Sequence, residues 1–197
     1  MELNLNRWHR TLLAGSTVIF SWLAMQAIHE TGHVLHAWAS GGTLARIVLD
    51  PLGISRTDVE PNPHPQFVAW GGPVWGSVWP LVMLGIVRAA HWQRAWLIAF
   101  FAGFCLVANG AYLLGGAFFP AGDAEVLLQN GASRLALVSF GIVATGAGFY
   151  LWNGLGTHFG WGKNHQPIDQ KVIWSMCAAT SVIIAAEWLA RLASHSE

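Results

Sequence analysis

Residues 11–39, TLLAGSTVIFSWLAMQAIHETGHVLHAWA, form a long apolar run that ends in a cluster of polar and ionisable side chains. A helix that spans a membrane needs about 20 residues, and this run is long enough. His29, Glu30 and His33 lie in its last part. A charged or strongly polar group inside a membrane helix costs at least about 2 kcal/mol, so such residues usually serve a function. The stretch therefore predicts both a membrane fold and a functional site in the first helix.

The remainder of the chain repeats the apolar pattern. Of its 197 residues, 54% are hydrophobic and 10% are charged, whereas soluble proteins average about 25% charged. Further apolar segments cover residues 67–90, 95–119, 135–155 and 172–192, and several of the 12 tryptophans lie near segment ends. We therefore expect an all-α polytopic membrane protein, with about five transmembrane helices in one domain over residues 1–197. The net charge of zero gives no reason to expect nucleic acid as a partner.

Two polar stretches interrupt the apolar segments. Residues 40–66 separate the first two, and RIVLDPLGISRTDVEP within them alternates loosely around a Pro-Leu-Gly turn. This pattern predicts a short β-hairpin-like insertion at the membrane surface. After the third segment, PAGDAEVLLQNGAS at residues 120–133 predicts a turn and a short amphipathic helix.

The polar cluster fits the pattern H-E-x-x-H, as His29-Glu30-Thr31-Gly32-His33. On a helix, residues four apart share a face, so the two imidazoles can bind one Zn²⁺. Glu30 adjoins the first histidine and can act as the general base for a water. His36 is a turn further along the helix, about 10 Å from His29 along the axis, so we expect an interfacial or supporting role for it.

A zinc site of this kind needs a third protein ligand. The ends of the third and fifth apolar segments emerge on the same side as the motif, which leaves two carboxylates as candidates. Asp123 follows Pro120 and Gly122, which break the helix and open space, and we prefer it. Glu187 is the alternative, because it can also pair with Arg191 on its own helix. His64, between prolines in the loop, is a weaker candidate for the edge of the site.

These motifs together resemble the site-2 protease family, the intramembrane zinc metalloproteases of the M50 type. HETGH lies in a transmembrane segment, a hairpin-like stretch follows it, and Gly72-Pro73 opens the next helix in WGGPVW. Asn109, Pro120 and Asp123 follow two segments later. The chain departs from the family pattern in having Gly-Asp-Ala where Leu-Asp-Gly is usual, and in the distance of Asn109 from the aspartate.

The resemblance implies roles for these residues. His29, His33 and Asp123 would hold zinc, Glu30 would be the catalytic base, and Asn109 would contact the substrate, although a buried asparagine bonded to a neighbouring helix fits equally well. The implied function is peptide hydrolysis in the membrane by a zinc metalloendopeptidase. The implied substrate is a single-pass membrane protein or a signal-peptide remnant, which an edge strand of the hairpin would bind and unwind.

Other functions remain possible for such a membrane protein. A membrane transporter of divalent metals, or an inactive membrane scaffold that binds metal, are alternative functions. A di-iron oxidase would use His29, His33 and His36, but such proteins need several more histidine clusters.

We expect an integral, multi-pass protein of the cell (plasma) membrane. The basic residues favour a cytoplasmic N-terminus, whereas the family resemblance favours a site that faces the cytosol, which requires the opposite insertion.

Overall fold

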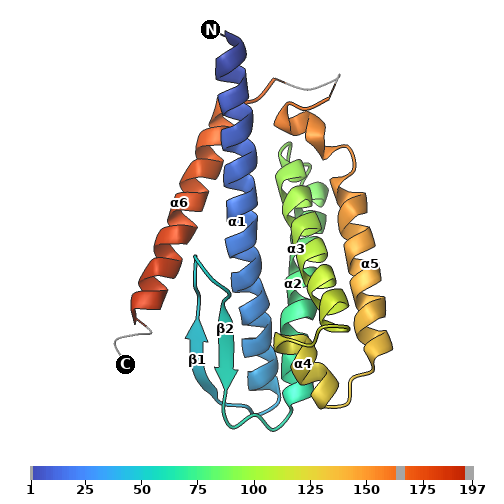
Figure 1. The fold of residues 1–197 in the computed structure, drawn as a ribbon. Helices are drawn as coiled ribbons and strands as arrows, with labels where there is room; N and C mark the ends of the chain where they lie inside the picture. Colours follow the sequence, from blue (N-terminus) through green and yellow to red (C-terminus); the bar gives the residue numbers. More distant parts are fainter. Residues whose placement is uncertain (1, 163–166, 194–197) are drawn as a thin grey trace.

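The computed structural model describes residues 2–162 and 167–193 of the chain. The long helices are α1 (Glu2–Ala39), α2 (Pro65–Ala89), α3 (Ala95–Gly116), α5 (Arg134–Trp152) and α6 (Gln170–Ala193). The shorter elements are strands β1 (Leu44–Val48) and β2 (Arg56–Val59), helix α4 (Gly122–Gln129) and the 3₁₀ turn η1 (Leu155–Phe159). The five long helices are apolar enough to cross a membrane. This confirms the predicted multi-pass helical fold with a small hairpin after the first helix (Figure 1).

Some helix ends differ from the sequence-based expectation, and each difference has a local cause. Helix α1 begins near residue 2 rather than 11, because no proline or glycine interrupts its polar first turns. Helix α3 ends at Gly116 rather than at 119, because Pro120 disfavours helical backbone in the residue before it. Helix α5 ends at Trp152 rather than at 155, because Gly154 takes a left-handed conformation with φ of 81°.

Helix α1 lies between α6 on one side and α2 on the other (Figure 1). Helix α2 in turn packs on α3, and α3 packs on α5. The backbones of α1 and α2 approach closely at Gly32 and Gly71, where a Cβ on either glycine would collide with the carbonyl of the other. Gly32 is the fourth residue of the H-E-x-x-H motif, so the motif itself allows α2 to lie against the face that carries the histidines.

The hairpin and α4 lie at the same end of the molecule, beside the C-terminal half of α1 (Figure 1). Strands β1 and β2 pair antiparallel, with Ile47 opposite Thr57 and Val48 opposite Arg56. Arg191 near the end of α6 forms an ion pair of 2.9 Å with Asp50 in the hairpin turn. Helix α2, the hairpin and α4 therefore lie around the part of α1 that carries the motif, and α6 is tied to the hairpin.

Candidate metal centre

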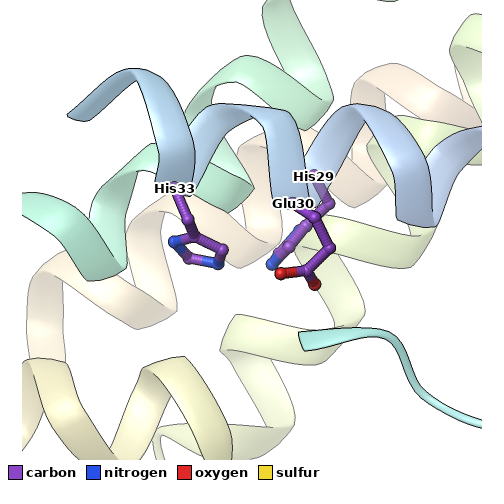
Figure 2. A group of neighbouring side chains, drawn as sticks. All are labelled: His29, Glu30 and His33. Atoms are coloured by element: carbon purple, nitrogen blue, oxygen red, sulfur yellow. The ribbon is translucent and has the colours of Figure 1, made fainter. Parts of the chain in front are cut away.

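Helix α1 presents His29, Glu30 and His33 to one side (Figure 2). One ligand atom from each of these residues lies within 4.8 Å of the others. The two imidazole rings are 4.9 Å apart between centroids, at an interplanar angle of 72°. Glu30 and His33 are each only 6% exposed. The helix spacing therefore gives the convergence of two imidazoles and a carboxylate that the sequence predicts.

Helix α4 brings Asp123 to the same point. One carboxylate oxygen, Oδ2, lies 2.9 Å from Nε2 of His29, and the other, Oδ1, lies 3.3 Å from Nε2 of His33. Hydrogen bonds donated by the rings of His29 and His33 in their protonated forms would lower the pKa of this carboxyl, against the effect of burial. A metal ion among the three groups takes the place of these protons, and the carboxylate binds it as an anion.

The opposite nitrogen of each imidazole makes a contact that fixes its tautomer. The amide of Asn109 donates through Nδ2 to the carbonyl of Cys105, which directs its Oδ1 toward His29. Nδ1 of His29 lies 2.7 Å from this oxygen, and Nδ1 of His33 lies 2.8 Å from the carbonyl oxygen of Val68. Both partners are acceptors, so both Nδ1 atoms carry the proton and donate it. In the neutral imidazoles, the two Nε2 atoms then present lone pairs to each other and to Asp123.

This arrangement fits a divalent metal. Two imidazole lone pairs and a carboxylate face one another, and a cation among them would satisfy all three acceptors. Histidines that bind metal almost always donate their other ring N–H to a carbonyl or carboxylate, as His29 and His33 do here. Two nitrogen ligands and one oxygen ligand also match the donor set of catalytic zinc sites, which keep a fourth position open.

Because Gly72 of α2 has no side chain, it leaves space where the Nε2 atoms of His29 and His33 meet the carboxylate of Asp123. A Cβ at this position would collide with Nε2 of both His29 and His33. Four residues further along α2, a Cβ at Gly76 would press on the amide of Asn109. The Gly72-x-x-x-Gly76 spacing is therefore more than a helix-packing pattern, because both glycines face the site.

A cleft of about 620 Å³ opens beside the four residues. Its walls come from the hairpin on one side and from α3 and the start of α4 on the other. The hairpin contributes Ile54, Ser55, Arg56, Thr57 and Val59, and the opposite wall contributes Ala108, Asn109, Tyr112, Ala121, Gly122 and Val126. Trp22, Met25 and Gln26 of α1 extend the lining along the helix toward its N-terminus. The cleft therefore runs from His33 past His29 toward the N-terminal half of α1.

Three residues around the site were not identified from the sequence. Thr57 of β2 donates its hydroxyl proton to Oε2 of Glu30 over 2.8 Å. Gln26, one turn before Glu30, accepts a hydrogen bond from the backbone N–H of Ser55. Tyr112 accepts one of 2.7 Å from the backbone N–H of Asp123. All three act through contacts between distant segments, so sequence spacing alone holds no signal for them.

The other candidates lie elsewhere. Glu187 is buried on α6 and is not among the residues that line the cleft. The ring of His36 stacks on Phe67, and its Nδ1 lies 2.6 Å from the carbonyl oxygen of that residue. His64 is exposed directly before α2, between the lining residues Asn62 and Pro65, but does not itself line the cleft. Asn109 lines the cleft, but its side chain bonds to His29 and Cys105, and its role as a substrate contact stays a prediction.

Residues 6–118 match a family model described as Peptidase M50B-like, which covers more than half of the chain. The matched region includes the H-E-x-x-H motif, the hairpin, Gly72 and Asn109, and it ends before Asp123. No curated protein and no solved structure matches the chain. The assignment of Asp123 therefore depends on the geometry of this structure and on the resemblance of its motif.

Proposed function

The chain belongs to the Peptidase M50B-like family, and on that premise we propose that it is an intramembrane zinc metalloendopeptidase. The observation that supports this most strongly is the meeting of two imidazole lone pairs and the Asp123 carboxylate beside Glu30, at the wall of a cleft. The five long helices are apolar enough to cross a membrane, which supports a substrate that is reached in or beside the bilayer.

His29, His33 and Asp123 are the residues that would hold the zinc ion. When bound, zinc supplies a Lewis acid that lowers the pKa of a water and polarises a peptide carbonyl. Asn109 and the carbonyl of Val68 hold the two rings in the tautomer that this role requires. Gly72 keeps the meeting point free of side-chain atoms.

Glu30 would move the proton. Its carboxylate is buried next to both histidines but is not needed as a ligand, because Asp123 completes the set. Oε2 accepts the hydrogen bond from Thr57, which leaves Oε1 to accept a proton from the attacking water. The same oxygen then delivers the proton to the amine nitrogen that leaves when the peptide bond breaks.

The substrate that fits this setting is a single-pass membrane protein or a signal-peptide remnant. A helix inside a bilayer protects its carbonyls, because each one is hydrogen-bonded within the helix. The substrate must therefore be extended locally before a carbonyl can enter the cleft. Strand β2 lines the cleft and would favour an extended substrate by pairing with it. We place the enzyme in the cell (plasma) membrane as a further part of this proposal.

The first prediction concerns Glu30→Gln. The variant keeps the size of the side chain but cannot accept the proton, so cleavage of a single-span test protein should fall by about 10²- to 10⁴-fold. Because Glu30 is not a ligand, zinc content should stay at the wild-type value. Both quantities are measured on the same purified preparation, by gel-based cleavage and by elemental analysis. Cleavage that persists while zinc stays bound would contradict the proposed mechanism.

A further inference from the structure

The hairpin docks on α1 through two hydrogen bonds that lie in register. The backbone N–H of Ser55 donates to Oε1 of Gln26, and the hydroxyl of Thr57 donates to Oε2 of Glu30, each over 2.8 Å. Gln26 and Glu30 are one helical turn apart, a rise of about 6 Å. Ser55 and Thr57 are two residues apart in extended chain, a rise of about 6.6 Å. The two rises are nearly equal, so the segment from Ser55 to Thr57 runs alongside α1 from Gln26 to Glu30.

Thr57 is well suited to hold a carboxylate in one orientation. As a β-branched residue it has restricted side-chain rotation, and its backbone is fixed by pairing with Ile47 of β1. Glu30, by contrast, has three rotatable side-chain bonds. In the described part of the chain, Thr57 is the one side chain that hydrogen-bonds to the Glu30 carboxylate. The bond occupies Oε2, which leaves Oε1 as the oxygen for the proton transfer proposed above.

We propose that Thr57 is a positioning residue for the catalytic base, so that the hairpin completes the active site rather than only covering it. The inference rests on the proposed function, in which Glu30 is that base. It assigns to the hairpin a task separate from substrate binding: without the Thr57 hydroxyl, the Glu30 carboxylate rotates among several orientations and is correctly placed for a smaller part of the time.

A purely structural role for this hydroxyl is distinguishable, because the hairpin has other anchors. The bond from the backbone N–H of Ser55 to Gln26 involves no atom of Thr57, so a substitution at Thr57 leaves its donor and its acceptor in place. The ion pair of Arg191 with Asp50 ties the hairpin turn to α6. Loss of the Thr57 hydroxyl should therefore leave the hairpin docked, the metal ligands in place and the cleft open to substrate.

The test compares Thr57→Val, which keeps the shape and branching but lacks the hydroxyl, with Thr57→Ser, which keeps the hydroxyl. Thr11→Val is the matched control, since Thr11 is exposed on α1 outside the motif and its hydroxyl bonds to the carbonyl of Arg7 on the same helix. Rates are measured on a synthetic single-span peptide with a fluorophore and a quencher on either side of the apolar segment. For Thr57→Val we expect kcat to fall about tenfold, with KM and zinc content unchanged. Thr57→Ser should restore kcat to within about twofold, and Thr11→Val should equal wild type.

A second readout needs no substrate. Removing a donor from a carboxylate shifts its infrared stretching band, so the Thr57→Val minus wild-type difference spectrum should contain a carboxylate band. The same substitution made in Glu30→Gln should give no such band. An unchanged kcat in Thr57→Val, a rise in KM alone, or failure of Thr57→Ser to restore the rate would overturn the proposal. A wild-type protein that cleaves nothing would instead contradict the proposed function, and the infrared comparison would still decide whether Thr57 holds Glu30.

Discussion

At the scale of single residues, the site depends on which atoms accept and which donate hydrogen bonds. Oδ1 of Asn109 and the carbonyl oxygen of Val68 accept hydrogen bonds from the Nδ1–H groups of His29 and His33. The Nε2 lone pairs are thereby turned toward Asp123, and a cation is the natural partner for all three groups. The space for this cation is set by the absence of a side chain at Gly72.

The second prediction is therefore that Gly72→Ala disrupts the centre. Its Cβ would collide with both Nε2 atoms, so we expect zinc affinity to fall by at least about tenfold. Gly85→Ala is the matched control, because Gly85 lies on the same helix and a Cβ there meets nothing within 4 Å. Both changes bring the same gain in helix propensity, about 0.5–1 kcal/mol. Competition with a zinc chelator measures the affinity, and equal affinities for the two variants would contradict the role given to Gly72.

At the scale of elements, the start of α4 decides whether Asp123 reaches the histidines. Pro120 follows the end of α3, and Gly122 turns the chain with a left-handed φ of 54°. A Cβ on Gly122 would collide with the hydroxyl of Tyr112, and that hydroxyl accepts the hydrogen bond from the N–H of Asp123. Tyr112 of α3 thus seats the first turn of α4 against the site.

The next prediction concerns the zinc affinity of Tyr112→Phe. It removes the acceptor for the Asp123 N–H but keeps the ring that lies edge-on to His29. Because Asp123 is then held less firmly, zinc affinity should fall about tenfold, which is typical for loss of a contact to a metal ligand. Tyr150→Phe is the control, since Tyr150 is 80% exposed on α5. If both variants keep wild-type affinity in a chelator titration, the start of α4 does not depend on this hydrogen bond.

The elements differ in how far the sequence predicts them. Apolar length predicts the five long helices, and alternation around the Pro-Leu-Gly turn predicts the hairpin, because both are local properties. Spacing along one helix likewise brings His29, Glu30 and His33 together. The contacts of Thr57, Gly72 and Tyr112 are different, because each joins segments that only tertiary packing brings together. The Gly72-x-x-x-Gly76 spacing is the sequence signal for this packing, since small residues four apart in a membrane helix often mark a close approach.

At the scale of the whole molecule, α1 carries the motif, and α2, α3, α4 and the hairpin contribute residues to the site around it. Helix α2 gives the space and the Val68 carbonyl, α3 gives Asn109 and Tyr112, and α4 gives Asp123. The hairpin gives Thr57 and is tied to α6 through Asp50 and Arg191. The central claim about this assembly is that it holds one divalent metal ion between α1 and α4.

Metal content of the purified protein tests this claim most directly. Wild type, Asp123→Asn and Glu187→Gln are analysed side by side for all first-row transition metals. Glu187 is the matched control, because it is also a buried carboxylate on a helix that packs against α1, yet it does not line the cleft. We expect about one zinc per chain in wild type and in Glu187→Gln, and a loss of most of it in Asp123→Asn. Full zinc content in Asp123→Asn, or its loss in Glu187→Gln instead, would contradict the account.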